Sequence, residues 1–445
     1  MQDFLIISRS MEKETKKSER ALQEEKILEF WKKNKIFEKS LKKESPKGNY
    51  VFYDGPPFAT GTPHYGHILG STVKDVVGRY QTMRGYAVPR RWGWDCHGLP
   101  IENIVEKDLG ISGKKAIEEL GIEKFVEHAR SKVLTYVAEW EKTINRIGRW
   151  VDFKNSYKTM DNTFIESVWW ALGELNKKEL LYEGVRVLAY CPRCETPIAN
   201  SEIAMDNSYK DISDISVYVK FKLKDEENTY LLAWTTTPWT LPGNTAIAVN
   251  KDIEYLKVRC TKKIPMVTQS LETKPQGSLE KTEIFILAKS LFENLKSRFE
   301  ENYVIHNTTE SFLGSELIGK SYEPVFDYYK NIDMPNKENI WKVWHADFVT
   351  IEKGTGIAHE APAFGEDDMN LAKAHNIPFI RHVEPNGTFS KEVVDFTGMK
   401  VKAKDTEEDK DAHLRTDIEV IKYLQKRLLI NIMCYIMEHT LIKKK

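Results

Sequence analysis

Between residues 50 and 100 the apolar positions follow two different periods. A short apolar run at 50–54 meets the turn formers at 55–57, which predicts a β-strand followed by a turn. Apolar residues then recur three and four positions apart, which predicts an amphipathic helix that ends at Gly85. The residues of this repeat are Ile68, Leu69, Val73, Val76, Val77 and Tyr80. A second strand is expected at 87–92, and the order strand, helix, strand predicts the opening of a parallel α/β domain.

The segments on either side of this region are expected to be helical. Residues 12 to about 40 are highly charged with one apolar edge, which predicts a solvated helix docked on the first domain. This edge consists of Leu22, Ile27, Phe30 and Trp31. Residues 114–182 are predicted to be mainly helical, and their tryptophans are the expected core anchors. These tryptophans are Trp140, Trp150, Trp169 and Trp170.

After Cys191 the pattern changes to short apolar runs that are typical of β-strands. The runs lie at 217–219, 230–234, 245–249 and 344–351. A polar stretch at 261–282 carries Pro, Gly, Ser and Lys and predicts a surface insertion. The chain therefore predicts a β-rich domain inserted after the first α/β half.

Length, composition and charge narrow the class of protein. At 445 residues the chain is too long for one ordinary core, so two or three domains are expected. It carries 66 Lys and Arg against 66 Asp and Glu, so any contact with RNA must rest on local patches. Five cysteines with one close pair indicate a reduced, cytoplasmic protein rather than a disulfide framework.

Neither a signal peptide nor a membrane segment is expected. The apolar run at 5–7 is too short for a signal-peptide core, and acidic residues follow it at once. Residues 428–442 are apolar but are interrupted by Asn431, Glu438 and His439, and they are shorter than a bilayer requires. A membrane is therefore not an expected partner.

Two histidines stand at the predicted start of the first long helix. His64 and His67 lie where the unpaired backbone N–H groups of a helix favour anions, which suits a nucleotide triphosphate. Taken alone, such histidines are more often helix caps or packing residues. Asp95 follows the second strand at the same carboxyl edge, where a carboxylate can hold a substrate ammonium group. A helix N-cap is the alternative interpretation of Asp95.

Two further motifs lie in the β-rich region. Residues 234–244 (WTTTPWTLPGN) bring four hydroxyls to the end of an apolar strand, although ordinary strand and turn threonines are the alternative. These threonines are Thr235, Thr236, Thr237 and Thr240. Residues 354–368 (GTGIAHEAPAFGEDD) hold His359 and Asp368 and do not form a zincin motif, because Ala363 stands four residues after His359. A solvated acidic loop is the alternative for the end of this motif.

Cys191 and Cys194 form a C-x-x-C pair. Such a pair is half of a four-ligand zinc site, so Zn²⁺ is a candidate cofactor that this pair alone cannot hold. A thioredoxin-like redox motif is less favoured, because the strand and helix that usually frame it are absent from the pattern.

Residues 55–67 (GPPFATGTPHYGH) and 93–102 (GWDCHGLPIE) together closely resemble the isoleucyl-tRNA synthetases, a family of class I aminoacyl-tRNA synthetases. The resemblance implies that isoleucine is activated with ATP and Mg²⁺ and then passed to tRNA(Ile). It implies that His64, Gly66 and His67 bind ATP, and that the two histidines are catalytic because they stabilise charge on the phosphates. Isoleucine would be held by Gly55, Pro56 and Asp95.

The two motifs of the β-rich region resemble the hydrolytic editing site of the isoleucyl, valyl and leucyl synthetases. The resemblance implies that the four threonines and His359 bind the acyl-adenosine end and position a water, while Asp368 holds the α-ammonium of a misplaced valine. A second site is needed because one missing methylene gives limited discrimination at the first. Some members of the family complete the zinc site with a second C-x-x-C, where this chain has only Cys434.

The resemblance extends from about residue 49 to about residue 411. It implies a first half of a Rossmann-like parallel-sheet catalytic domain with an inserted β-rich editing domain. The expected parts are a charged helical arm at 1–48, the catalytic half at 49–200, the editing domain at 201–402, and a return segment with a divergent tail at 403–445.

No string like K-M-S-K-S occurs in the chain, so a truncated family member is expected, with a complementing C-terminal chain as a further partner. The alternatives are an inactive or binding-only fragment and an autonomous editing domain without synthetic activity.

Overall fold

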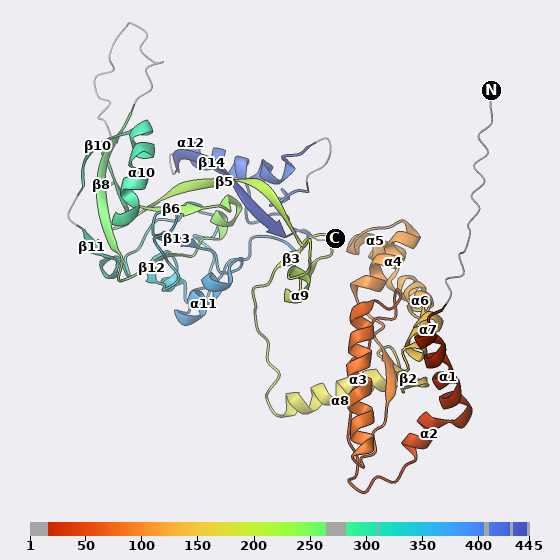
Figure 1. Cartoon of the computed structure of the whole chain (residues 1–445). Coiled ribbons are helices and arrows are strands. Elements are labelled where there is room, and N and C mark those ends of the chain that lie inside the picture. The colour runs from red at the N-terminus through yellow and green to blue at the C-terminus, as the bar shows by residue number, and fades with distance from the viewer. Residues whose placement is uncertain (1–16, 264–281, 309–310, 405–408, 428–429, 443–445) are drawn as a thin grey trace, which may run out of the picture. The chain divides into compact units, whose positions relative to one another are not determined.

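The computed structural model describes residues 17–263, 282–308, 311–404, 409–427 and 430–442. The chain divides into two compact units, Met1–Glu183 (unit 1) and Gly184–Lys445 (unit 2), which are described separately. Figure 1 shows the helices of unit 1 in red to yellow and the sheets of unit 2 in green to blue. The polar stretch at 261–282, predicted to be a surface insertion, lies almost wholly outside the described residues.

Unit 1 begins with two helices rather than the single charged helix predicted for 12–40. α1 (Glu19–Asn34) ends where Lys35 adopts a left-handed conformation with φ of 50°, and α2 (Ile36–Leu41) follows directly. The backbone N–H of Lys35 donates to the carbonyls of the last turn of α1, which completes a C-terminal cap. Charge patterning does not reveal such a break, because a left-handed residue need not be glycine.

The parallel strands of unit 1 are shorter than predicted. β1 (Arg91–Trp94) pairs in parallel with β2 (Asp152–Lys158), and the segment at 49–58 meets its neighbour only through isolated parallel bridges, Asn49 to Ala87 and Phe58 to Asp95. The strand expected at 50–54 is therefore wrong, and the one at 87–92 is displaced toward Trp94. The prolines of the turn at 55–57 have no N–H to donate to a ladder.

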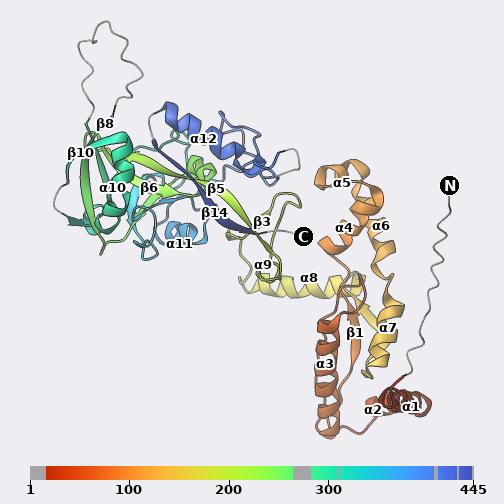
Figure 2. The same cartoon turned by 45° about the horizontal axis from the view of Figure 1, so that its top comes forward.

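α3 (Tyr65–Met83) is the helix that the periodicity predicted, but it buries the opposite face. Its buried residues are Ser71, Gly78 and Thr82, and the apolar repeat is largely exposed. Leu69, Val73, Val76 and Tyr80 are 67%, 56%, 60% and 52% exposed. Small residues lie inward because two arginines pack there: a Cβ on Gly78 would lie 3.1 Å from Arg90 Cδ, and Arg149 donates to Ser71 Oγ at 3.2 Å. In both overall views α3 runs beside the parallel pair (Figure 1, Figure 2).

Residues 114–182 are mainly helical, as predicted, apart from β2, and a further helix precedes them at 99–109. The helices are α4 (Leu99–Leu109), α5 (Lys114–Leu120), α6 (Ile122–Val133), α7 (Val137–Arg146) and α8 (Asn162–Lys177). Their core contains Trp92, Trp94 and Trp140, of which Trp140 was predicted. Trp169 and Trp170 on α8 are 71% and 70% exposed within the described structure, so their prediction as core anchors is wrong.

Unit 2 is mostly β-structure, as the run of short strands predicted. It opens with a hairpin, β3 (Tyr190–Cys191) and β4 (Thr196–Pro197), and a short helix, α9 (Asn200–Ile203). The larger sheet has the strand order β10-β8-β9-β6-β5-β14 in the described residues, with β11 paired to β8. Its strands are β5 (Tyr209–Lys222), β6 (Thr229–Thr235), β8 (Glu254–Lys262), β9 (Thr282–Ala288), β10 (Tyr303–Thr308), β11 (Phe312–Leu313) and β14 (Ile430–Ile442).

A second sheet packs on the first and carries part of the candidate site. Its order is β12-β7-β13, formed by β12 (Lys342–His345), β7 (Ala246–Val249) and β13 (Ile357–Glu360). The strand predicted at 344–351 therefore begins earlier and ends at His345. Helices α10 (Lys289–Asn302), α11 (Glu366–Ala374) and α12 (Arg415–Lys426) complete the unit.

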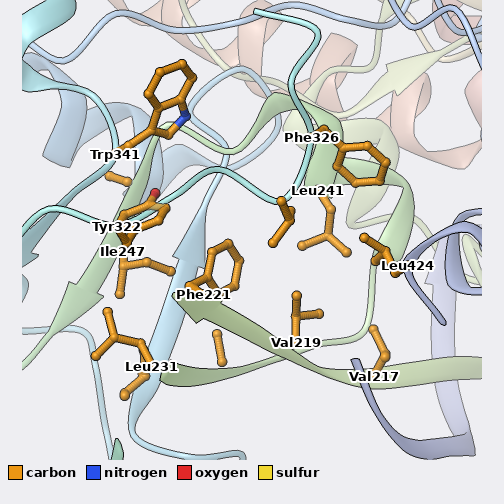
Figure 3. Close-up of a cluster of buried hydrophobic side chains, with 14 of the residues drawn as sticks. Val217, Val219, Phe221, Leu231, Leu241, Ile247, Tyr322, Phe326, Trp341 and Leu424 are labelled. Atoms are coloured by element: carbon orange, nitrogen blue, oxygen red, sulfur yellow. The ribbon is translucent and has the colours of Figure 1, made fainter. Parts of the chain in front are cut away.

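The main core of unit 2 lies between the two sheets. Val217, Val219 and Phe221 alternate along β5 and point toward Leu241 and Ile247, as Figure 3 shows. Three residues of α12, Val420, Ile421 and Leu424, are also buried in this cluster. The opposite face of β5 packs on a second cluster with α10. Among the described helices none is long and apolar enough to cross a membrane.

Replacement of Gly93 tests how tightly the parallel pair of unit 1 is packed. A Cβ at Gly93 would lie 2.2 Å from Cζ of Tyr157, so Gly93→Ala is expected to lower the free energy of unfolding by about 1–3 kcal/mol. Gly173→Ala is the control, because Gly173 lies inside α8 with nothing within 4 Å of the place that a Cβ would take, and alanine there favours the helix by up to about 1 kcal/mol. Urea unfolding of the full chain measures both; equal effects of the two substitutions would contradict the packing.

Candidate functional site

The predicted histidine pair of unit 1 forms the N-terminal cap of α3. His64 is the N-cap residue, and its Nδ1 accepts a hydrogen bond from the backbone N–H of His67 at 3.4 Å. The backbone N–H of His64 donates in turn to Nδ1 of His67 at 3.3 Å. The two rings are stacked with their centroids 3.6 Å apart. Since both Nδ1 atoms accept, each ring carries its hydrogen on Nε2.

Capping and anion binding are compatible at this pair. The caps use Nδ1, which leaves the Nε2–H groups of His64 and His67 as donors for an oxygen-rich ligand such as a phosphate. Burial lowers the pKa of His67, and the neighbouring His64 and Lys74 lower it further. The ring therefore donates as a neutral imidazole at pH 7.

A cavity of about 380 Å³ opens beside the start of α3. Its lining includes Gly55, Pro56, Gly66, His67 and Lys74. The ammonium group of Lys74 is paired with the carboxylate of Asp54 and donates to the carbonyl of Gly55 at 3.0 Å. Gly66 and His67, predicted to bind the nucleotide, thus line the same cavity as Gly55 and Pro56, predicted to bind the amino acid. The ammonium group of Lys74 lies in this lining as well.

Asp95 lies directly after β1, at the carboxyl edge of the parallel pair. Its N–H donates to the carbonyl of Pro57 at 2.9 Å and its carbonyl accepts from Ala59 at 3.0 Å, so its backbone is fixed beside the 55–57 turn. The N-cap of α4 is Gly98. Asp95 is therefore not a helix cap, which was the alternative interpretation of this residue.

The threonines of unit 2 lie where β6 passes into a 3₁₀ turn, η1 (Pro238–Gly243). Thr237 donates its backbone N–H to Thr235 Oγ1 at 3.1 Å, and the Oγ1 atoms of these residues are 3.3 Å apart. The Oγ1 atoms of Thr237 and Thr240 are 3.4 Å apart, and the Thr240 hydroxyl lies 2.8 Å from the carbonyl of Thr237. Thr236 is half-buried between Thr235 and Thr237.

His359 joins the threonines although it lies more than a hundred residues away in sequence. It is on β13, opposite Ile247 of β7, and its Nε2 is 2.8 Å from Thr240 Oγ1. Its Nδ1 is 3.0 Å from the side-chain amide nitrogen of Asn244. Burial, assisted by His382, lowers the pKa of His359 to about 3, so the imidazole is neutral at pH 7.

Asp368 lies in the first turn of α11. Its Oδ2 accepts the backbone N–H of Ala361 at 2.7 Å, and its carboxyl group is hydrogen bonded to that of Glu360. Burial raises the pKa of Asp368 and raises that of Glu360 well above its usual range. The acidic end of the motif is thus the start of a helix. Its carboxyl pair consists of the buried Glu360 and the half-buried Asp368, whereas Glu366 and Asp367 are exposed.

The cysteine pair stands in the β3–β4 hairpin. Cys191 is buried, Cys194 is half-buried, and Arg193 Nη1 lies 3.5 Å from Cys194 Sγ. The described residues contain no group of three or more His, Cys, Asp or Glu side chains that could hold a metal ion. A tetrahedral zinc site needs four ligands, so these two thiols do not fit Zn²⁺ by themselves.

Residues 26–386 match the family described as tRNA synthetases class I (I, L, M and V). The chain belongs to this family. Two similar relatives are isoleucine–tRNA ligases, from Wolbachia pipientis wMel (46% identical over 400 residues) and from Treponema denticola (43% over 430 residues). These matches confirm the resemblance inferred from the two motifs of the α/β region.

This class I synthetase chain spans just over a third of the length of those relatives. The matches cover 85% and 91% of the chain but 36% and 37% of the two ligases. Among solved structures, one titled "The crystal structure of GlLeuRS-CP1" aligns with 50% of this chain and 98% of its own, at 14% identity. The TM-score of this alignment is 0.32.

Sequence reasoning missed three polar residues that hold these sites of the synthetase chain. Lys74 and Arg149 line the cavity of unit 1 and pair with Asp54, and Asn244 holds His359 in unit 2. Asn244 stands two residues before the apolar strand β7, a position where an amide is expected to be buried and bonded. For Lys74, the sequence signal was a lysine four residues after Gly70, which places its cation near the start of α3.

His382 of the synthetase chain supports the threonine turn and predicts a pH dependence. It is fully buried, its Nε2 lies 2.9 Å from the Trp239 carbonyl, and burial lowers its pKa to about 4. Because an unfolded histidine binds its proton near pH 6.5, the unfolded state takes up more protons than the folded state as the pH falls. Stability is therefore full above pH ~6.5 and is lost from ~6.5 toward about 4.

Urea unfolding of wild type and His382→Asn between these pH values measures this contribution. The slope of unfolding free energy against pH is expected to be shallower in the variant by up to about 1.4 kcal/mol per pH unit. His375→Asn, at the half-buried end of α11, is the matched control and should keep the wild-type slope. An unchanged slope in His382→Asn would show that this ring takes up its proton in the folded chain.

Proposed function

We propose that unit 2 hydrolyses the ester bond of a misacylated tRNA, as the editing step of an isoleucine–tRNA ligase. One observation carries the proposal: Thr235, Thr237, Thr240 and His359, from β6, η1 and β13, form one hydrogen-bonded cluster. A set of fixed hydroxyls suits a ribose and a water better than it suits metal or redox chemistry. The proposed substrate is tRNA(Ile) that carries valine.

The reaction is a transfer of the acyl group to water. The water oxygen attacks the ester carbonyl, the bond from the carbonyl carbon to the ribose oxygen breaks, and that oxygen takes a proton, so valine and tRNA are released. The hydroxyls of Thr235 and Thr237 orient the water and donate to the developing oxyanion, whereas that of Thr240 donates to the Thr237 carbonyl. Thr236, half-buried between its neighbours, contributes a further hydroxyl to the acyl-adenosine end.

Asp368 is proposed to bind the α-ammonium group of the valyl ester. A carboxylate that accepts from Ala361 N–H is fixed in place, and a charge-assisted hydrogen bond distinguishes a free amino acid ester from a peptide. Its neighbour Glu360 is 1% exposed and holds the proton that the pair shares, which leaves a single negative charge for the ligand.

Removal of the Asp368 charge tests the editing proposal. Asp368→Asn keeps an oxygen for the Ala361 N–H but loses the charge, so release of valine from valyl-tRNA(Ile) by the full chain is expected to fall about ten- to hundredfold. Asp367→Asn removes the same charge from the exposed neighbouring position and should stay within about twofold of wild type. No release above background by the wild-type chain, or equal rates in the two variants, would refute the proposal.

We also propose that unit 1 binds ATP with Mg²⁺ and isoleucine and belongs to a Rossmann-like catalytic domain into which unit 2 is inserted. The cavity beside α3 supports ATP binding, because its lining contains the start of the helix together with His67 and Lys74. In activation the isoleucine carboxylate attacks the α-phosphorus of ATP and pyrophosphate leaves. The Nε2–H groups of His64 and His67 donate to the phosphates, Gly66 lets them approach, and Gly55, Pro56 and Asp95 hold the amino acid.

ATP binding by the full chain tests this second proposal. His64→Gln and His67→Gln each remove an imidazole donor, and each is expected to raise the dissociation constant for ATP with Mg²⁺ about tenfold in equilibrium dialysis. His128→Gln, on the surface of α6, is the control and should bind as wild type does. ATP binding that is the same in all variants would place the nucleotide elsewhere.

A further inference from the structure

The side-chain amide of Asn244 can point in only one direction. Its Nδ2 lies 2.8 Å from the carbonyl of Ala246 and 3.4 Å from that of Glu360, and both of these oxygens can only accept. Its Oδ1 lies 2.7 Å from the hydroxyl of Tyr322. The NH₂ end therefore faces the two carbonyls, and the Tyr322 O–H donates to the amide oxygen.

The amide orientation decides where His359 carries its hydrogen. Nδ1 of His359 faces the NH₂ group of Asn244 at 3.0 Å and must accept from it. The ring hydrogen is then on Nε2 and is donated to Thr240 Oγ1 at 2.8 Å, and the Thr240 hydroxyl passes its own hydrogen to the carbonyl of Thr237. Each hydrogen bond in the series that runs from Tyr322 through Asn244, His359 and Thr240 to Thr237 thus has only one possible donor.

We propose that Tyr322 is a positioning residue of the candidate editing site, which through Asn244 holds His359 in its Nε2–H form. In this form both ring nitrogens are engaged, so His359 orients the threonine turn by donating a hydrogen bond and does not act as the general base. This inference rests on the proposed hydrolytic function for its consequence in rate, but the tautomer is a property of the chain alone.

Tyr322 is suited to this task by its surroundings. Its side chain is fully buried, and its ring meets Phe221 edge-on at 5.4 Å between centroids; Figure 3 shows it beside Ile247 and Trp341. The ring of Phe221 in turn lies nearly parallel to that of His359, at 6.5 Å. Burial raises the pKa of Tyr322 well above its usual range, so its hydroxyl keeps its proton and donates at every physiological pH.

Loss of the Tyr322 hydroxyl is expected to release the amide. A buried Oδ1 without a donor carries a desolvation penalty in the orientation that the structure shows. The rotated amide offers its oxygen to His359 and favours the Nδ1–H form, although it gives up the bonds to the two carbonyls. The two orientations therefore come closer in energy, and both tautomers of His359 become populated.

The test compares Tyr322→Phe with Tyr303→Phe in the full chain. Tyr303 is a matched control, because it is 2% exposed, lies in the second cluster of unit 2, and its hydroxyl lies 3.4 Å from Glu283 instead of Asn244. Long-range proton–nitrogen NMR spectra of the histidine rings report which nitrogen is protonated, and loss of the signals in His359→Gln assigns them. Wild type and Tyr303→Phe should show a protonated Nε2 and a bare Nδ1 at pH 7, whereas Tyr322→Phe should show both nitrogens shifted toward averaged values.

Hydrolysis of valyl-tRNA(Ile) gives the second measurement. Tyr322→Phe is expected to lower kcat about tenfold with KM within about twofold, and Tyr303→Phe to leave both unchanged. A protonated Nδ1 in wild type, or an unchanged tautomer in Tyr322→Phe, overturns the inference, even if the rate falls. A wild-type chain without hydrolysis refutes the proposed function instead, and the spectra still decide the tautomer.

Discussion

The buried carboxylate of Asp54 holds together the parts of unit 1 that surround its cavity. Asp54 is 7% exposed and is paired with the ammonium of Lys74 on α3 and the guanidinium of Arg149, which is itself 8% exposed. An ion taken out of water carries a penalty of several kcal/mol unless it is paired, so α3 and the segment before β2 must both approach the 55–57 turn. Tyr157 of β2 adds a hydrogen bond to the Asp54 carbonyl at 2.7 Å. The position of Gly55 and Pro56 beside His67 is a consequence of this pairing.

Unit 2 also contains a buried carboxylate that must be paired, and this carboxylate lies on α12, far in sequence from the threonine cluster. Asp417 of α12 is fully buried, accepts the backbone N–H of Trp239 at 2.9 Å, and is paired with Lys402, which also binds Asp214 on β5. Burial raises the pKa of Asp417 to about 6, and the charge of Lys402 opposes that shift. The 3₁₀ turn that carries Thr240 is thus held at the backbone of Trp239 by both α12 and His382. Helix α12 and the 3₁₀ turn η1 together hold the cluster of threonines and His359 in place.

Sequence pattern predicted the spacing of elements better than it predicted their contacts. The helix at Tyr65–Met83 and the strands containing Val217 and Ile247 were found because their periods are local properties of the chain. A period does not reveal which face is covered, and for this reason the buried face of α3 was reversed. Asn244 lies 115 residues from His359 and 78 from Tyr322, and a pairing at such separation depends on the fold of the two sheets. The individual motifs were visible, but the amide that connects them to the core was not.

The two histidine sites of the chain differ in what they leave free for a ligand. In unit 1 the backbone occupies Nδ1 of His64 and of His67, so each Nε2–H can be given to a phosphate without the loss of an existing side-chain bond. In unit 2 both nitrogens of His359 are engaged within the protein, and a substrate could use one only by displacing Thr240 or Asn244. If unit 2 catalyses the proposed ester hydrolysis, the base must come from outside this ring, and the threonine hydroxyls and the substrate's own ribose are the groups left to organise the water. The same residue type therefore leaves its Nε2–H available to a ligand in one unit and is part of the scaffold in the other.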